Sequence, residues 1–308
     1  MIGIKAIASY IPKHGVNNIE QAERFGETPE FVTSKLGSQF LPRLDEGTDT
    51  SDLAVHAVEA LINKSGLDKE EIDALVVVTQ NPDGTGLPHC SAIVQSKLEL
   101  STSVAAFDVS LGCSGYVYGL SIVQGLMQAA GLKNAVLVTA DPYSKVINND
   151  DRVTSMLFGD AATATWLGED PVWHVKDVRF GTDGNGAKHL CVSDGHLSMN
   201  GRQVFNFAAQ KVAPAIRALL QDNQWAEDDV DAYLMHQGSL AIVDAISRNF
   251  RDNANKFLRS MEGTGNTVSS SIPVLLERCM KDKELKQLVL SGFGVGFSWA
   301  TALLVRNQ

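Results

Sequence analysis

Short apolar runs rich in Val, Ile and Ala alternate with helical patterns along the whole sequence. Residues 74–79 read Ala-Leu-Val-Val-Val-Thr, which is typical of a strand buried on both faces, and they follow an expected helix at 51–65 that stops at Gly66. Further strands are expected at 105–109, 134–140 and 161–167, with another helix at about 114–130. Such alternation requires sheets that are covered by helices on both faces. The sequence therefore predicts an α/β fold.

The second half of the chain repeats this layout. Strands are expected at 172–180, 232–235, 288–291 and 298–305, and helices at 204–222, 241–250 and 272–282. The Gly-Glu-Asp-Pro stretch at 168–171 is the best candidate for a boundary. We therefore divide the chain into halves at 1–168 and 169–308, and we expect a duplicated unit with a site at the junction.

Composition and charge exclude several classes of function. The 26 Lys and Arg residues against 36 Asp and Glu give a net charge of −10, whereas a nucleic-acid partner would require a basic surface. No run of about 18 apolar residues is present to span a membrane. The first ten residues lack the basic and apolar regions of a signal peptide, so we expect a cytoplasmic protein without a membrane partner. The cysteines, Cys90, Cys113, Cys191 and Cys279, lie far apart without metal-ligand spacing, and we expect neither a disulfide nor a metal site.

One cysteine stands where a nucleophile could be activated. Residues 109–116, Val-Ser-Leu-Gly-Cys-Ser-Gly-Tyr, place Cys113 just after an expected strand and at the start of an expected helix. Free backbone N–H groups and the positive end of the helix dipole lower the pKa of a thiol at such a position. Gly112 and Gly115 flank it and permit a tight turn and the close approach of a substrate. Close packing of small residues explains this segment alone equally well.

Three further segments accompany the cysteine. Residues 234–238 place His236 at the end of a buried strand, and residues 263–267 place Asn266 among glycines before a helix. Alone, such a His or Asn is usually structural. Residues 291–297 form a Gly-rich turn whose backbone N–H groups can face an anion, but they lack the Lys of a phosphate loop. Each segment is a weak signal by itself, whereas the ordered set of four is specific.

This ordered set resembles a known family. Together with Asp151-Arg152 and Phe158-Gly159-Asp160, the segments are similar to those of the β-ketoacyl-acyl-carrier-protein synthase III family of the thiolase superfamily. The similarity runs over essentially the whole chain and includes Thr50-Ser51-Asp52-Leu53-Ala54, Asn200-Gly201-Arg202-Gln203-Val204-Phe205 and Phe297-Ser298-Trp299. The resemblance implies a thiolase-like five-layered αβαβα fold, a homodimer, and a Cys, His and Asn that meet between the two halves.

The resemblance also implies a reaction. An acyl group from an acyl-CoA or acyl-carrier thioester would load onto Cys113, with the backbone N–H groups of Cys113 and Val295 as the oxyanion hole. A malonyl thioester, on CoA or on a carrier protein, would then lose CO₂, and His236 and Asn266 would stabilise the enolate that attacks the acyl-cysteine. The residues implied to bind substrate or CoA are Phe31, Arg152, Gly201, Arg202 and Phe205, and those implied to shape the acyl pocket are Leu87 and Leu111. No metal or redox cofactor would be needed.

The chain departs from the family pattern at the entrance and in the pocket. After His-Gln the family usually carries Ala-Asn-x-Arg, but residues 238–241 here are Gly-Ser-Leu-Ala, and only Arg248 remains nearby for an acidic carrier protein. The usual Ala-Ala-Cys is replaced by Leu-Gly-Cys at residues 111–113, and Leu87 stands where a bulky Phe often closes the acyl pocket across the dimer. We therefore expect a specialised pathway with an unusual acyl chain or acceptor, instead of housekeeping fatty-acid initiation.

Two other functions stay open. Relatives of this kind can pass the acyl group to oxygen, nitrogen or water without forming a carbon–carbon bond. Others are non-catalytic partner subunits of a heterodimeric synthase, but these usually lose one of the three residues, whereas Cys113, His236 and Asn266 are all present. The intact His and Asn favour decarboxylative condensation, because both would serve the enolate.

Overall fold

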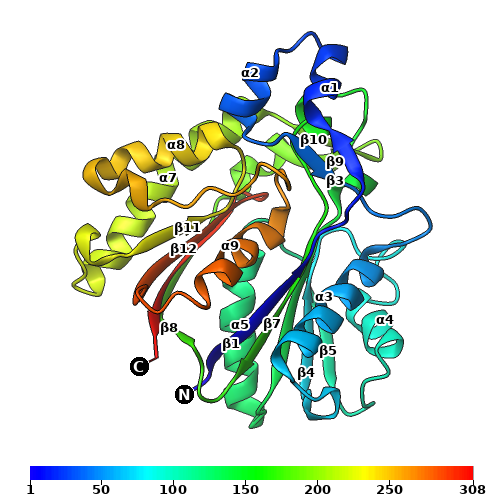
Figure 1. Cartoon of the computed structure of the whole chain (residues 1–308), viewed down its shortest axis with the longest axis vertical. Helices are drawn as coiled ribbons and strands as arrows, with labels where there is room; N and C mark the ends of the chain where they lie inside the picture. The colour runs from blue at the N-terminus through cyan, green and yellow to red at the C-terminus, as the bar shows by residue number, and fades with distance from the viewer. Residues whose placement is uncertain (308) are drawn as a thin grey trace.

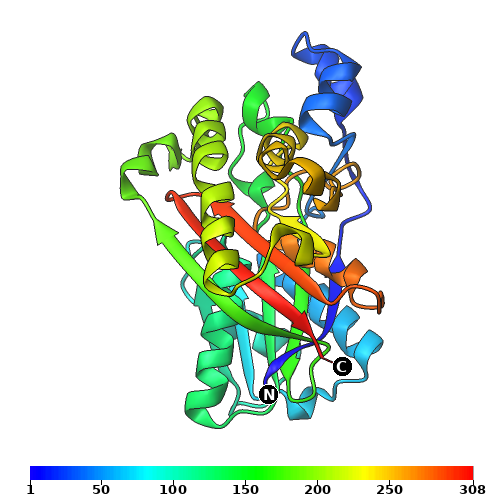
Figure 2. The ribbon, with the colours of Figure 1, turned by 90° about the vertical axis from the view of Figure 1, so that its left-hand side faces the viewer.

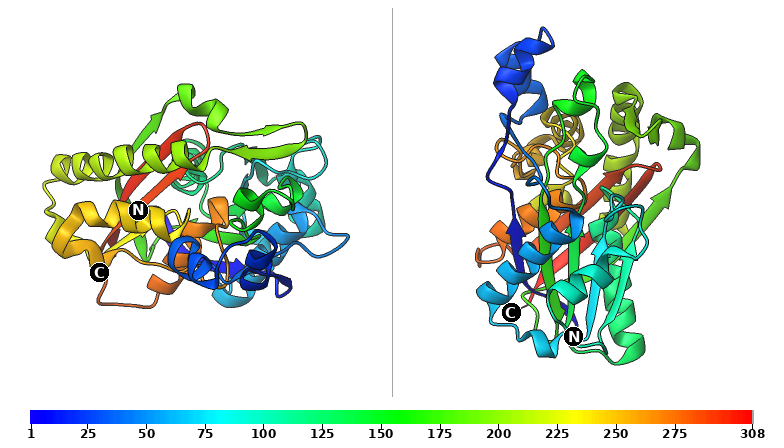
Figure 3. Two further views of the ribbon diagram at one scale, coloured as in Figure 1. Left: turned by 90° about the horizontal axis from the view of Figure 1, so that it is seen from above. Right: turned by 90° about the vertical axis from the view of Figure 1, so that its right-hand side faces the viewer.

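Helices and sheet sections alternate in five layers in the computed structural model, which describes residues 1–307 (Figure 1). One outer layer is α3 (Thr50–Ser65) with α4 (Cys90–Lys97), and the other is α7 (Gly201–Asp222) with α8 (Leu240–Ser247), as Figures 2 and 3 show from the two sides. The middle layer is α5 (Gly115–Ala130) with α9 (Ser271–Cys279), which pack on strands of both sheet sections. The five-layered αβαβα fold expected from the sequence is confirmed.

The strands between these layers form one sheet in two sections. The N-terminal section contains β1 (Gly3–Tyr10), β4 (Ala74–Val78), β5 (Ala105–Val109), β6 (Ala135–Ala140) and β7 (Ala162–Gly168). The C-terminal section contains β8 (Trp173–Thr182), β11 (Ala232–Met235), β12 (Gln287–Gly294) and β13 (Ser298–Arg306). The smaller elements are α1 (Asn18–Arg24), α2 (Pro29–Phe31), α6 (Arg152–Ser155), β2 (Gly15–Asn17), β3 (Phe40–Pro42), β9 (Leu190–Ser193) and β10 (His196–Met199). In Figure 1, α1, α2, β9 and β10 lie at the end of the molecule opposite the two termini.

The two sections share one strand order. The N-terminal section runs β5-β4-β6-β7-β1 and the C-terminal section runs β11-β12-β13-β8, so that β4 corresponds to β11, β6 to β12 and α5 to α9. The pairs β4–β6 and β11–β12 are parallel, and the following pairs β6–β7 and β12–β13 are antiparallel. Within residues 1–307, the ladder between β1 and β8 that links the sections has one residue pair, Ile4 with Trp173. The boundary drawn at 168/169 falls between β7 and β8.

Glycines let α5 pack closely on the N-terminal section. A Cβ at Gly119 would lie 2.8 Å from Cδ1 of Leu137, and a Cβ at Gly115 would collide with Val78. The core between the sections gathers apolar side chains of α5, α9 and the strands on both sides. This close packing fixes the beginning of α5, and with it Cys113, against the ends of the strands.

The expected elements differ from the observed ones mainly at helix ends. The helix expected at 241–250 is α-helical only to Ser247, because Arg251 has a non-helical φ of 43° that interrupts the following turns. The helix expected at 272–282 ends at Cys279. The hairpin of β9 and β10 is missing from the sequence prediction, because its strands have only 4 residues each and no clear alternation of apolar residues.

No helix within residues 1–307 is both long enough and apolar enough to cross a membrane.

Candidate active site

Cys113 lies in the turn between β5 and α5, with 6% of the residue exposed. The turn is closed by a 2.7 Å hydrogen bond from the N–H of Gly115 to the carbonyl of Gly112. The backbone N–H groups of Cys113 and Val295 are directed at the sulfur. The end of β12 packs directly on this sulfur, since a Cβ at Gly294 would lie 2.8 Å from Sγ. The cysteine therefore has two N–H donors, one from each half of the chain.

The surroundings of Cys113 favour its neutral thiol. Burial raises the pKa of this thiol and the nearby carboxylate of Asp141 raises it further, while the two backbone N–H groups act in the opposite direction. The backbone N–H groups expected from the sequence to lower this pKa do act in that direction, but desolvation is the larger effect and the net pKa is raised. Burial also raises the pKa of Asp141 to about 6.

His236 directly follows β11 and is 3% exposed. Its backbone N–H donates to the carbonyl of Ser291 at 2.9 Å, which keeps the residue in line with β12. Its Nδ1 lies 2.8 Å from Oγ of Ser271, at the start of α9, and the edge of its ring meets Phe293 with centroids 5.5 Å apart. Burial lowers the pKa of His236 to about 3, so the imidazole is neutral.

Asn266 lies in the segment that leads into α9 and is 5% exposed. Its N–H donates to the carbonyl of Leu157 at 2.9 Å, and its carbonyl accepts from Gly159 at 3.0 Å, so the C-terminal half is anchored here on the N-terminal half. The side-chain Oδ1 accepts from the N–H of Val268 at 2.9 Å. Nδ2 donates to the carbonyl of Gly238 at 3.5 Å and has a second proton that it can donate to a substrate.

These three side chains line one cavity of about 200 Å³. Its walls come from both halves of the chain and include Tyr143, Leu157, Phe158, Leu190, Met199, Phe293 and Val295. The structure thus brings together the Cys, His and Asn that the sequence singled out, at the junction where the sequence analysis expected a site.

The residues expected to bind substrate are only partly gathered here. Four of them, Phe31, Arg152, Gly201 and Phe205, line the same cavity. Arg152 forms an ion pair with Glu27, and its guanidinium carbon lies 5.9 Å from the centre of the Phe31 ring. Arg202 and Leu111 are outside the lining: Arg202 is exposed on the first turn of α7, and Leu111 is half-buried before the nucleophile turn.

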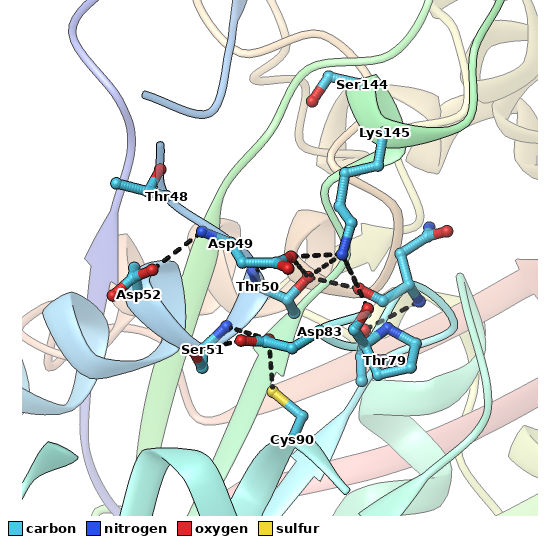
Figure 4. A network of polar contacts seen from close by, with 12 residues as sticks. Thr48, Asp49, Thr50, Ser51, Asp52, Thr79, Asp83, Cys90, Ser144 and Lys145 are labelled. Atoms are coloured by element: carbon cyan, nitrogen blue, oxygen red, sulfur yellow. Dashed lines mark hydrogen bonds and ion pairs between the residues drawn. The ribbon is translucent and has the colours of Figure 1, made fainter. Parts of the chain in front are cut away.

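Leu87 lies outside the cavity of the single chain and is 90% exposed. It sits in the loop between β4 and α4, which a polar network holds in place (Figure 4). Lys145 Nζ donates to the carbonyl of Pro82 at 2.8 Å, and Asp83 accepts from the N–H of Ser51 at 2.8 Å. The network fixes the loop, but the side chain of Leu87 at its tip is not covered by any part of residues 1–307.

Sequence reasoning missed three residues around the triad. Tyr143 lines the cavity, Asp141 raises the pKa of the Cys113 thiol, and Ser271 contacts the imidazole. A polar Asp directly after an apolar strand is a usable signal, but the other two depend on tertiary packing. Within residues 1–307, no group of three or more His, Cys, Asp and Glu side chains is arranged to hold a metal ion.

Comparisons with known proteins agree with this geometry. The family model described as 3-oxoacyl-[acyl-carrier-protein (ACP)] synthase III matches residues 107–184, and the model of its C-terminal part matches residues 220–306. The β-ketoacyl-[acyl-carrier-protein] synthase III of Lactococcus lactis subsp. cremoris (strain SK11) is 33% identical over 98% of this chain and 98% of its own length.

Two solved structures have the same fold. A crystal structure of a 3-oxoacyl-(acyl-carrier-protein) synthase III superposes with a TM-score of 0.92 at 31% identity and covers 99% of each chain. The priming β-ketosynthase of the R1128 polyketide biosynthetic pathway superposes with a TM-score of 0.89 at 27% identity, over 100% of this chain and 97% of that one. The chain therefore belongs to the β-ketoacyl-[acyl-carrier-protein] synthase III family and is a thiolase-like condensing acyltransferase.

Proposed function

We propose that this enzyme loads an acyl group on Cys113 and condenses it with a malonyl-type thioester by decarboxylative Claisen condensation. The observation that carries the proposal is the buried cavity at which Cys113 meets His236 and Asn266 from the other half. A nucleophile beside two backbone N–H groups, together with a separate pair of neutral side-chain donors, suits the two oxyanions of this reaction.

The first step would transfer the acyl group to the enzyme. The sulfur of Cys113 attacks the thioester carbonyl, the bond to the donor sulfur breaks, and the proton of the Cys113 thiol leaves with the free donor thiol. Because burial raises the pKa of Cys113, we expect the thiolate to form only with a donor in place. The N–H groups of Cys113 and Val295 would stabilise the tetrahedral oxyanion, and losing one such donor typically costs about 10²–10³ in rate.

The second step would form the carbon–carbon bond. The malonyl carboxylate leaves as CO₂, and the electrons of the broken bond form an enolate whose carbon attacks the acyl carbon. The sulfur of Cys113 leaves and takes up a proton. The products are CO₂ and a β-ketoacyl thioester on the carrier that brought the malonyl group.

His236 can assist this step because it is neutral. A neutral imidazole donates from Nε2 only when Nδ1 carries no proton, and a hydrogen bond donated to Nδ1 favours this tautomer. The hydroxyl of Ser271 has a single proton, which it can give to Nδ1 at 2.8 Å or to the carbonyl of Val268 at 3.0 Å. We propose that the enolate step uses the first arrangement, so that His236 Nε2 and Asn266 Nδ2 both donate to the enolate oxygen.

The thioester arm would enter along Phe31, Arg152, Gly201 and Phe205, which line the same cavity. Arg152 would exchange its ion pair with Glu27 for a nucleotide phosphate, and the exposed Arg202 at the start of α7 would add positive charge nearby. We propose acyl-CoA as the acyl donor and a malonyl thioester, on CoA or on a carrier protein, as the extender.

We also propose that the pathway is specialised and that the enzyme works in the cytoplasm as a homodimer. The net charge of −10 and the run Gly-Ser-Leu-Ala at 238–241 make a poor surface for an acidic carrier. The exposed Leu87 supports a second copy of the chain as its cover. Equal kcat/KM with acetyl-CoA and the malonyl carrier of general fatty-acid synthesis, at the level of a housekeeping enzyme, would contradict the specialised role.

The test of the proposed function is covalent loading. Purified protein is incubated with a panel of acyl-CoA thioesters and its intact mass is measured, beside Cys113→Ala and the control Cys279→Ala, which removes another buried thiol outside the cavity. We expect mass gain in the wild type and in Cys279→Ala, and none in Cys113→Ala. Mass gain that survives Cys113→Ala would contradict the proposal, as would no mass gain from either acyl-CoA or acylated carrier protein.

A further inference from the structure

A polar pair, Tyr143 and Gln80, lies beside the nucleophile turn. The cluster that contains Cys113 also contains the buried apolar side chains of Ile147, Leu157, Phe158, Leu190, Leu197 and Val268. Within it, Tyr143 lines the cavity, is 3% exposed, and donates from its hydroxyl to Oε1 of Gln80 at 3.0 Å. Gln80 is half-buried and is not among the residues that line the cavity. A buried phenol in such surroundings carries a desolvation cost, so the presence of Tyr143 beside the nucleophile requires an explanation.

Gly112 makes room for this pair. A Cβ at this position would collide with Oε1 of Gln80, and it would also lie 3.3 Å from Cγ1 of Val268. The alanine that usually precedes the nucleophile in the family would therefore displace the amide of Gln80. The replacement of Ala by Gly and the polar side chain are thus two parts of one change in the pocket.

Hydrogen bonds join the two segments that carry Gln80 and Tyr143. The N–H of Gln80 donates to Asp141 Oδ1 at 2.7 Å, which links the segment after β4 to the segment that carries Tyr143. Two residues further along, Lys145 donates to the carbonyl of Pro82 at 2.8 Å (Figure 4). The two segments are therefore fixed relative to each other, and the hydroxyl and amide are preorganised.

Both groups keep unused hydrogen-bonding capacity. Nε2 of Gln80 makes no hydrogen bond to the part of the chain that the structure describes, residues 1–307, and the oxygen of Tyr143, while donating to Gln80, can still accept. An acyl hydroxyl is complementary to this pair, because it can accept from Nε2 and donate to the phenolic oxygen. A plain alkyl chain would leave this remaining capacity of the phenolic oxygen unused.

We propose that the acyl group taken by Cys113 is short and carries a hydroxyl on its second or third carbon, and that Tyr143 and Gln80 select for it. This inference rests on the proposed function, in which Cys113 is acylated. The apolar cluster and the ring of Phe158, whose centroid lies 4.8 Å from that of Tyr143, limit the length of the chain. The hydroxyl would then lie within a few bonds of the thioester, beside the pair.

The test is a competition for loading. Wild-type enzyme receives equimolar butyryl-CoA, 2-hydroxybutyryl-CoA and 3-hydroxybutyryl-CoA, and intact mass separates butyryl from hydroxybutyryl adducts at early times, with each isomer then run alone against butyryl-CoA. We expect at least one hydroxybutyryl group to load about tenfold faster than butyryl. Tyr143→Phe should bring this ratio close to one. Tyr116→Phe, which removes a buried hydroxyl 3.3 Å from Thr165 and outside the cavity, should keep the wild-type ratio.

Gln80→Met is the second variant, used as well because Tyr143→Phe could lose stability; it should reduce the ratio while thermal unfolding confirms a folded chain. Equal or faster loading of butyryl by the wild type would overturn the inference, as would an unchanged ratio in the folded variants. Failure of every acyl group to load on Cys113 would instead overturn the proposed function, so the two failures are distinguishable.

Discussion

The two halves of the molecule place different chemistry at corresponding positions. The residues after β4 lead to Gln80, and the residue after the corresponding strand β11 is His236. The turn before α5 carries Cys113, and the start of the corresponding helix α9 carries Ser271. The N-terminal half thus supplies the nucleophile and the Tyr143–Gln80 pair beside it, whereas the C-terminal half supplies neutral hydrogen-bond donors. Because the framework is duplicated, corresponding strand and helix ends of the two halves meet at one site. The residues at each set of ends can change independently.

In both halves, burial shifts the pKa of titratable groups in favour of their neutral forms. It raises the pKa of Cys113 and of Asp141 in the N-terminal half, and it lowers the pKa of His236 in the C-terminal half. At neutral pH the thiol and the imidazole are therefore uncharged, whereas Asp141, with a pKa of about 6, is mostly ionised. We infer that charge develops mainly after a thioester has entered, where the donors of both halves can meet it.

The largest effect is expected from removing the nucleophile that the N-terminal half supplies. Cys113→Ala should reduce acyl loading to below about one thousandth of the wild-type rate, because Cys90, Cys191 and Cys279 lie outside the cavity. Slow decarboxylation of a malonyl thioester should persist, since His236 and Asn266 remain. Release of labelled CO₂ from the variant measures this residual activity, and its complete loss would mean that the two halves do not act separately.

Removing a donor of the C-terminal half should leave acyl loading intact and slow condensation. His236→Ala and Asn266→Ala each remove one enolate donor, so we expect the condensation rate to fall about 10²–10³-fold while acyl loading changes little. Single-turnover loading, followed by a chase with malonyl thioester, separates the two steps. An equal loss in both steps would contradict the division of roles between the halves.

The neutral state of His236 predicts a dependence of stability on pH. Its folded pKa of about 3 lies below its ordinary value of about 6.5, so the unfolded chain binds an extra proton between these values and the fold loses stability as pH falls through this window. At pH 5 the loss attributable to His236 is about 2 kcal/mol relative to pH 8.

Urea unfolding of the wild type and of His236→Gln at both pH values measures this difference, because the contributions of the other titrating groups cancel. We expect the stability of the wild type relative to the variant to fall by about 2 kcal/mol between pH 8 and pH 5. A constant difference would show that His236 is not neutral by burial.

A smaller effect is expected at Ser271. Ser271→Ala removes the hydroxyl beside Nδ1, frees the imidazole to take the other tautomer, and should slow condensation about tenfold while loading is unchanged. Ser270→Ala is the matched control, because the Ser270 hydroxyl bonds to Thr139 at 2.8 Å and not to the imidazole. Equal effects of the two changes on condensation would assign Ser271 a structural role only.

The sequence predicted the framework and the triad because both leave local signals. Runs such as residues 74–79 and the Gly-flanked Cys113 can be recognised without knowing what packs on them. The thiol pKa could not be predicted, since it depends on the depth of burial and on Asp141, which comes from another strand. The Tyr143–Gln80 pair is likewise a contact between residues separated by 63 positions, and no pattern along the chain brings them together.

The central claim is that the two halves act in sequence on one acyl group, and a chase of isolated acyl-enzyme tests it most directly. Enzyme acylated at Cys113 is freed of donor and mixed with a malonyl thioester labelled with carbon-13. The account predicts one CO₂ per acyl group lost from the enzyme, and a β-ketoacyl thioester that contains both the unlabelled acyl carbons and two labelled carbons. Loss of the acyl group as an acid, ester or amide, without CO₂ and without label in the product, would contradict condensation and establish acyl transfer to water, oxygen or nitrogen in its place.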